Sequence, residues 1–218
     1  MTRVLLVDAH PVFLSGLAAL VERALGYTVV ARATTHADAL AAFDAERPSL
    51  VLLDLFVGTE DGLDLVRAFS ASACRARVLV VSGHDEQAYA GRAIKAGAHG
   101  YVSKAALEAD VLQAIRTVAE GQVALSPGVR ERLVERYLGH ADLPTSPVSV
   151  LTDRELEAFR LFGLGLPTAE VAASMGVSAK TVETYRLSVK SKLGLSSNNE
   201  FIYRAVLWTL GRTTPEGA

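Results

Sequence analysis

Short apolar runs and amphipathic stretches alternate along the first 120 residues of the chain. The apolar runs, which predict strands, cover residues 4–7, 28–31, 50–53, 78–81 and 100–102. Apolar residues recur at helical spacing over residues 11–25, 37–46, 63–70, 86–96 and 108–120. A strict alternation of five strands and five helices is typical of an α/β fold. Because continuous Val and Leu runs are typical of strands covered on both faces, we predict a five-stranded, doubly wound parallel sheet of the flavodoxin-like kind.

The pattern changes after residue 121. Ser126 and Pro127 favour the start of a helix, because serine caps a first turn and proline fits its first position. Residues 139–150 are rich in proline and serine, which predicts a mobile linker. We therefore divide the chain into a first domain at residues 1–121, a linker with one helix at 122–150 and a second domain at 151–212.

The second domain is predicted to be an all-α domain of four helices. A capping-box sequence at residues 152–155 starts the first helix, and the last helix spans about 198–210. Between them, an amphipathic stretch at 169–175 is followed by Gly176 and then by a basic stretch at 179–193. A helix, a glycine-containing turn and a basic helix are typical of a helix-turn-helix that binds DNA.

The basic stretch has two unlike faces when it is drawn as a helix capped by Ser178. Val182, Val189 and Leu193 share one face, which predicts packing on a core. The opposite face is mostly polar and holds Lys180, Thr184, Leu187 and Ser191. This layout is typical of a helix in the major groove of DNA, with its centre on base edges and its flanks on phosphates. The alternative is a solvated surface helix.

We predict base contacts by Glu183, Thr184 and Leu187, because a carboxylate can accept from cytosine and methyl groups can touch thymine. The other side chains predicted to lie on DNA, mostly on phosphates, are Lys180, Thr181, Tyr185, Arg186, Lys190 and Lys192. Glu183 could instead orient Arg186 or Lys180 within the protein. Two copies on an inverted repeat would bind double-stranded DNA more tightly than one, which favours a homodimer.

The distribution of charge agrees with this division of roles. Residues 148–212 hold eight Lys and Arg against six Asp and Glu, a net of +2, whereas residues 1–147 hold fourteen against seventeen, a net of −3. The single cysteine, Cys74, excludes an intrachain disulfide. Because no apolar run approaches the about 18 residues of a membrane helix and no signal peptide precedes Asp8, we predict a cytoplasmic protein without a membrane span.

Side chains with useful chemistry stand at the ends of four predicted strands. Asp8, Asp54, Ser82 and Lys104 each lie at or just after the carboxyl end of a different strand. In a doubly wound sheet these ends meet at one edge, where ligands bind. Asp54 can attack a phosphoryl group, the carboxylates can hold Mg²⁺, and Lys104 can pair with phosphoryl oxygens. Taken singly, such an Asp is usually a turn or cap residue and such a Lys is usually solvated.

Several segments of the chain resemble a known family. They are residues 4–11, 51–55, 78–83, 96–104 and 151–157. The first domain resembles the receiver of response regulators, and the whole chain resembles the NarL/FixJ class with a LuxR-type helix-turn-helix. The resemblance implies that Asp54 is the phosphoacceptor, that Ser82 and Tyr101 form a switch pair, and that Lys104 binds the phosphoryl group. It also implies a sensor histidine kinase as partner and a dimer contact through the last helix. The alternative for that helix is that it only closes the core of the second domain.

The chain departs from that family at two positions. Ala9 stands where the family carries a second acidic residue that binds Mg²⁺ directly, which leaves Asp8, Asp54 and the backbone carbonyl of Phe56 as predicted ligands and predicts weak binding. Gly58 replaces the usual proline, so residues 57–62 are predicted to form a flexible loop whose two acidic residues could replace the missing carboxylate or simply be solvated. Two hypotheses follow: a switch operated by phosphorylation of Asp54, and an atypical receiver regulated by a ligand or partner.

Other functional classes are less well supported by the residues. An aspartyl-phosphate hydrolase usually has a second Asp two residues after the nucleophile, where this chain has Phe56, so we predict no enzymatic activity. An interaction scaffold is the remaining rival to a transcriptional regulator. His10, His36, His84 and His99 lack the spacing of metal ligands, and we predict surface or cap positions for them.

Overall fold

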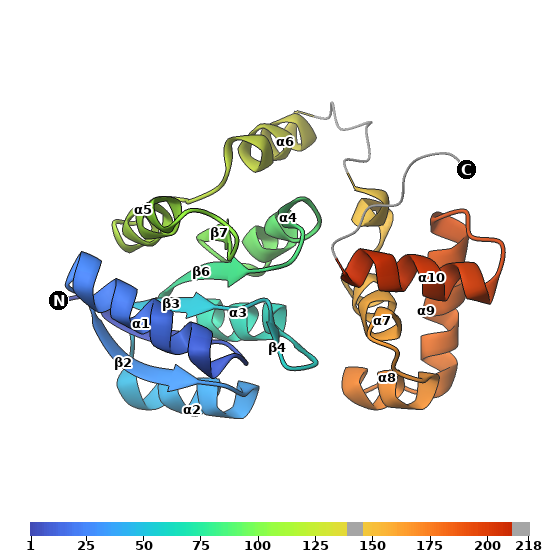
Figure 1. Ribbon diagram of the computed structural model, residues 1–218, viewed down its shortest axis with the longest axis horizontal. Helices are drawn as coiled ribbons and strands as arrows, with labels where there is room; N and C mark the ends of the chain where they lie inside the picture. Colours follow the sequence, from blue (N-terminus) through green and yellow to red (C-terminus); the bar gives the residue numbers. More distant parts are fainter. Residues whose placement is uncertain (139–145, 211–218) are drawn as a thin grey trace. The chain divides into compact units, whose positions relative to one another are not determined.

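The computed structural model describes residues 1–138 and 146–210. The chain divides into two compact units, Met1–Ala141 and Asp142–Ala218. The first unit, drawn from blue to yellow-green in Figure 1, contains a sheet with helices packed around it. In its described part the second unit, drawn in orange and red, is built of helices.

A parallel sheet with strand order β2-β1-β3-β6-β7 forms the centre of the first unit. Its strands are β1 (Arg3–Val7), β2 (Thr28–Ala33), β3 (Leu50–Leu53), β6 (Arg77–Ser82) and β7 (Gly100–Ser103). The helices between and after them are α1 (Pro11–Leu25), α2 (His36–Glu46), α3 (Gly62–Ala71), α4 (Glu86–Ala96) and α5 (Glu108–Ala119). The predicted five-stranded, doubly wound α/β fold is therefore confirmed.

Apolar side chains on both faces of the sheet hold the helices in place. On one face, Leu6 lies in a buried cluster with Leu17 of α1 and Ile115 of α5. The neighbouring residues of each strand point to the opposite face, which α2 and α3 help to cover. There Phe43 of α2 stacks on Phe69 of α3 with ring centroids 4.3 Å apart. The polar residues that follow the strands are thus fixed by a rigid, two-sided core.

The segment after β3 is a short hairpin, where the sequence predicted a loop without strands. β4 (Phe56–Val57) pairs in antiparallel register with β5 (Glu60–Asp61). Gly58 has φ +70°, the left-handed conformation that glycine adopts without strain. Phe56 and Val57 are 6% and 3% exposed, so their buried side chains hold the first strand of the hairpin against the core.

The chain after α5 runs along the outer edge of β7. The Ala124 N–H donates to the His99 carbonyl at 3.0 Å, and the Tyr101 N–H donates to the Ala124 carbonyl at 2.9 Å. Ala124 therefore forms a parallel bridge with Gly100. Because an unpaired sheet edge exposes backbone donors and acceptors, this bridge protects part of the edge at β7.

Helix α6 (Pro127–Tyr137) follows, and Ser126 accepts the Val129 N–H at 3.3 Å as the capping prediction requires. The helix packs against α4, where Leu133 lies beside Gly91. The first compact unit therefore extends beyond the predicted boundary at residue 121. The reason is that residues 122–138 pack on the sheet and on α4 rather than forming a free linker.

The second unit consists of a 3-10 helix η1 (Pro147–Val150) and four α-helices, α7 (Asp153–Gly163), α8 (Thr168–Met175), α9 (Ala179–Lys192) and α10 (Asn198–Thr209). The four predicted helices are confirmed. The predicted mobile linker at 139–150 lies partly outside the described residues. For residues 147–150 the prediction is wrong, because they form η1. Val148 in η1 is 2% exposed, so this turn is anchored in the core of the second unit.

Side-chain caps define where these helices begin. Thr152 and Glu155 form a complete capping box at the start of α7. Ser178 and Ser197 each accept a backbone N–H from the first turn of α9 and α10. Gly176, at φ +63°, makes the tight turn between α8 and α9. No helix among the described residues has both the length and the apolar character needed to cross a bilayer.

Candidate functional site

Two carboxylates and an ammonium meet at the carboxyl edge of the sheet. Asp8 follows β1, Asp54 follows β3 and Lys104 follows β7. Lys104 Nζ lies 2.5 Å from Asp8 Oδ2 and 2.7 Å from Asp54 Oδ2. We call these three residues the acidic pocket. The parallel strands bring them together, although Asp54 and Lys104 are 50 positions apart in the chain.

The backbone fixes the positions of both carboxylates. The Asp54 N–H donates to the Val7 carbonyl at 2.8 Å, which ties the end of β3 to β1. Asp54 Oδ1 accepts the Leu55 N–H at 2.7 Å, so Oδ2 is the oxygen that Lys104 engages. Asp8 and Asp54 are only 2% and 6% exposed. The side-chain charges of the acidic pocket sum to −1, which is a buried excess of negative charge.

Burial raises the pKa of Asp54, because a carboxylate away from water loses hydration of its charged form. The hydrogen bond and positive charge of Lys104 oppose that rise, the negative charge of Asp8 adds to it, and a hydrogen bond from Ser82 opposes it. Asp54 is therefore a basic carboxylate held at a fixed place. Such a group is suited to accept an electrophile or to bind a cation.

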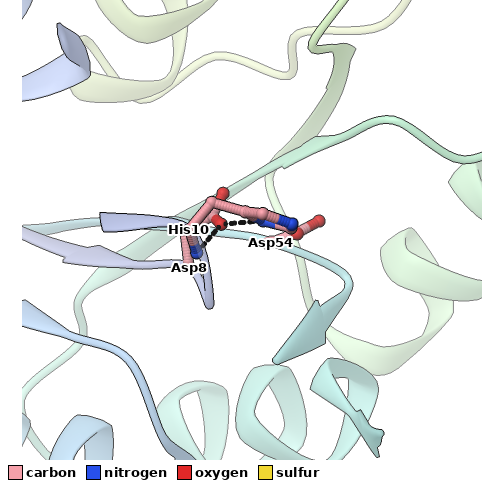
Figure 2. Close-up of side chains that lie close together, drawn as sticks. All are labelled: Asp8, His10 and Asp54. Carbon is pink, nitrogen blue, oxygen red and sulfur yellow. Dashed lines mark hydrogen bonds and ion pairs between the residues drawn. The ribbon is translucent and has the colours of Figure 1, made fainter. Parts of the chain in front are cut away.

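His10 joins the acidic pocket from the start of α1 (Figure 2). Asp8 Oδ1 accepts the His10 backbone N–H at 2.8 Å and lies 2.8 Å from His10 Nδ1. One possible ligand atom from each of Asp8, His10 and Asp54 lies within 4.8 Å of the others. The predicted surface or cap position is confirmed for His10, which is exposed and is the N-cap residue of α1, but its place beside two carboxylates was not predicted. The spacing Asp-x-His directly after a strand places the two residues near each other in the sequence, but it does not give the direction of the His10 ring.

The ligand atoms around this pocket do not match the all-oxygen shell that Mg²⁺ prefers. Ala9 supplies no carboxylate, and the imidazole of His10 stands beside the two that remain. Glu60 and Asp61 lie elsewhere: Glu60 is 3.8 Å from His36 Nδ1, and Asp61 caps α3 by accepting the Leu63 N–H at 2.9 Å. The suggestion that these two residues replace the missing carboxylate is thus unsupported by their contacts.

The predicted switch residues lie next to the acidic pocket. Ser82 is fully buried, and its hydroxyl accepts the His84 N–H at 3.4 Å. Tyr101 is 2% exposed and its hydroxyl donates to the His84 carbonyl at 3.0 Å. Burial raises the pKa of Tyr101, so its hydroxyl stays protonated and able to donate. Ser82 and Tyr101 are therefore linked through the backbone of one residue.

Helix α9 presents the two faces expected from the sequence. Val182 and Val189 are fully buried. The residues of the opposite face are all exposed, and they are Lys180, Thr184, Leu187 and Ser191. Leu187 is 64% exposed, so its apolar side chain is open to contact on this face. Among the described residues, no other element of the second unit covers the polar face, so this face is open to a binding partner.

Several charged residues of α9 are bound inside the second unit. Glu183 pairs with Arg186 and accepts the Thr168 hydroxyl at 3.1 Å. Lys192 Nζ lies 2.6 Å from Glu155 Oε2, and Lys190 Nζ donates to Asn198 at 3.2 Å. Contacts of this kind were foreseen for Glu183, as the alternative in which it orients Arg186, but not for Lys192.

Glu155 is a structural residue that sequence analysis assigned only to a helix cap. Burial would raise its pKa, but hydrogen bonds from Lys192, Ser188 and Thr152 hold the pKa at about 2. Ser188 Oγ donates to Glu155 Oε1 at 2.6 Å. The ionised carboxylate therefore joins α7 to two positions of α9.

Comparison with known proteins accounts for both units. Residues 4–116 match the response regulator receiver domain, and residues 149–205 match the bacterial regulatory proteins of the luxR family. The transcriptional activator protein ExaE of Pseudomonas putida is 34% identical over 203 residues, which are 93% of this chain and 95% of that protein. A nitrate/nitrite response regulator protein homolog of Haemophilus influenzae is 31% identical and covers 89% of this chain and 91% of its own.

Solved structures show the same fold. The RcsB response regulator of Salmonella typhimurium aligns with a TM-score of 0.75 over 95% of this chain and 98% of its own, at 21% identity. At that identity the likeness concerns the fold alone, whereas the receiver and luxR matches and the 34% identity to ExaE concern the family. The chain belongs to the LuxR/NarL family of DNA-binding two-component response regulators.

Proposed function

We propose that phosphorylation of Asp54 controls how the helix-turn-helix of this chain binds DNA. The observation that carries the proposal is the contact between Lys104 Nζ and Asp54 Oδ2 at 2.7 Å. It pairs a buried nucleophilic carboxylate with the cation that would neutralise an incoming phosphoryl group. A sensor histidine kinase is the proposed donor.

The proposed step transfers one phosphoryl group. Asp54 Oδ2 attacks phosphorus, the bond between phosphorus and the imidazole nitrogen of the donor breaks, and an acyl phosphate forms on Asp54. Lys104 moves with the added oxygens, and Ser82 donates a hydrogen bond to one of them. Because the Ser82 hydroxyl also accepts the His84 N–H, its rotation would alter the segment that Tyr101 contacts.

Mg²⁺ is proposed to bind weakly, since Asp8, Asp54 and the carbonyl of Phe56 form an incomplete ligand set. No step above depends on it. Ala9 and the ion pairs of Lys104 with both carboxylates favour a second hypothesis, in which a ligand or partner controls an unphosphorylated receiver.

The proposed DNA surface centres on the exposed face of α9. Lys180, Thr184 and Leu187 lie there, with Thr181, Tyr185 and Lys190 beside them. Glu183, Arg186 and Lys192 have partners within the unit, and we propose that they position α9 more than they read bases. A homodimer on an inverted repeat is proposed to supply the affinity that one small domain lacks.

Incubation of the full chain with acetyl phosphate tests this proposal. A mass gain of one phosphoryl group in the wild type and not in Asp54→Asn, together with tighter binding to genomic DNA fragments, is the expected result. DNA binding without any mass gain would overturn control by phosphorylation and support the second hypothesis. Matched incubations in EDTA and in Mg²⁺ show how far the modification depends on a cation.

A further inference from the structure

We propose that the chain binds a divalent transition metal such as Co²⁺, Ni²⁺ or Zn²⁺ through Asp8, Asp54 and the imidazole of His10. The site shares two residues with the proposed phosphoryl chemistry, but it depends neither on phosphoryl transfer nor on DNA binding. A receiver usually binds its cation with oxygen ligands only. Here the imidazole nitrogen of His10 replaces the carboxylate that is absent at Ala9.

The distances allow these side chains to share one ion. His10 Nδ1 is 2.8 Å from Asp8 Oδ1, and the ligand atoms of Asp8, His10 and Asp54 all lie within 4.8 Å of one another. Two ligands bound at about 2.1 Å to one metal are at most about 4.2 Å apart. The cluster must therefore contract by a few tenths of an ångström to share an ion, and the His10 side chain, at 72% exposed, has room to turn.

The charges of the pocket favour an added cation. Asp8 and Asp54 are almost fully buried, and Lys104 offsets only one of their two negative charges. Asp8 Oδ2 lies 2.5 Å from that ammonium but accepts no hydrogen bond from any residue that the structure describes. Because two buried carboxylates share this one ammonium, a bound divalent ion would offset the negative charge that Lys104 leaves.

The type of ligand selects the type of metal. Mg²⁺ is a hard ion that binds oxygen and keeps most of its water, so an imidazole adds little to its binding. Imidazole with carboxylates suits Co²⁺, Ni²⁺ and Zn²⁺, whose affinities for such sites exceed those of Mn²⁺. Figure 2 shows the His10 ring next to Asp8 and Asp54. A nitrogen ligand in this position favours transition metals over Mg²⁺.

Calorimetric titration of the untagged full chain with Co²⁺ and with Mg²⁺ tests the site without a phosphodonor or DNA. Co²⁺ should bind at least about 100-fold more tightly than Mg²⁺. Because loss of a group that merely supports a ligand already costs about 10–100-fold in affinity, His10→Gln should weaken Co²⁺ binding at least about tenfold and leave Mg²⁺ binding within about twofold. In proton NMR, the Co²⁺-shifted imidazole N–H resonance should disappear in His10→Gln.

His36→Gln is the matched control, because His36 also lies near a carboxylate, 3.8 Å from Glu60, but outside the cluster. It should leave the Co²⁺ affinity unchanged. Ala9→Asp should raise the Mg²⁺ affinity by restoring an oxygen ligand. Equal affinities of the wild type for the two metals, or equal Co²⁺ affinity in wild type and His10→Gln, would overturn the proposal. Neither result would bear on phosphorylation of Asp54 or on DNA binding, which are read by mass and by DNA titration.

Discussion

Lys192 Nζ lies 2.6 Å from Glu155 Oε2, and this contact joins the last turn of α9 to the first turn of α7. The same carboxylate accepts the Ser188 hydroxyl at 2.6 Å and the Thr152 N–H at 2.7 Å. It therefore serves as helix cap and as inter-helix link at once. Because α9 carries the polar face, Glu155 helps to hold that helix against α7.

Glu155→Ala should lower the free energy of unfolding by about 1–3 kcal/mol, because it removes a buried, charged acceptor that serves Thr152, Ser188 and Lys192. Urea unfolding at pH 7 measures the change. Lys190→Met is the matched control, since Lys190 bonds only to the exposed Asn198 in the contacts described, and it should shift the value by less than about 0.5 kcal/mol. Equal effects of the two substitutions would contradict the structural role of Glu155.

The stability that Glu155 supplies should depend on pH. Its pKa is held at about 2 in the folded chain, below the ordinary value of 4.5. Its contribution is therefore complete above about pH 4.5 and is lost as the pH falls toward 2, because the unfolded chain binds the proton first. The difference in unfolding free energy between wild type and Glu155→Gln should shrink between pH 6 and pH 3. A difference that stays constant over this range would contradict the assignment.

The sequence predicted the sheet well because its strands are continuous apolar runs. Residues 50–53 and the helices at 11–25 and 86–96 have the predicted bounds, since a turn residue or proline stands at each end. The hairpin of Phe56 and Asp61 was missed because strands of two residues are too short to show alternation. Val148 was missed because proline and serine around it dominate the local composition, whereas its burial depends on tertiary packing.

The acidic pocket could be predicted from the sequence because the topology of a parallel sheet places its residues together. Asp8, Asp54 and Lys104 follow parallel strands, whose ends must share an edge. The contacts of Glu155 with Ser188 and Lys192 span 33 and 37 positions, and no local pattern reports them. His10 lies two positions from Asp8, but one histidine among other polar residues does not reveal the direction of its ring.

Asp54→Asn should raise the free energy of unfolding by about 1 kcal/mol or more in EDTA at pH 7.5. It removes one of two buried carboxylates that share the single charge of Lys104, and like charges at close range destabilise each other. Burial, which raises the pKa of Asp54, acts in the same direction. Asp64→Asn, at a carboxylate that is 58% exposed, should stay within about 0.5 kcal/mol. A less stable Asp54→Asn would show that the excess charge is compensated.

Lys190→Ala and Leu187→Ala should affect DNA binding in different ways. Loss of a phosphate contact at Lys190 should weaken binding to specific and random DNA alike and lower the salt slope by about 1. Loss of the exposed Leu187 side chain should instead cost about 1 kcal/mol at one base pair of the preferred site. Fluorescence anisotropy over a series of salt concentrations and single-base variants separates the two. The same loss on every sequence for both variants would contradict this division.

Gly100→Ala tests whether the segment at Ala124 is part of the sheet. A Cβ at Gly100 would lie 2.6 Å from the Ala124 carbonyl oxygen, which already accepts the Tyr101 N–H at 2.9 Å. The chain must shift, and the expected loss of unfolding free energy is about 1–3 kcal/mol. Gly91→Ala is the control, because its Cβ would meet Leu133 at an ordinary 3.6 Å within a helix, and alanine there should be neutral or stabilising by about 0.5–1 kcal/mol. Faster amide exchange at Tyr101 in Gly100→Ala alone would locate the damage at this edge, whereas unchanged stability and exchange would mean that residues 123–125 do not pair with β7 in solution.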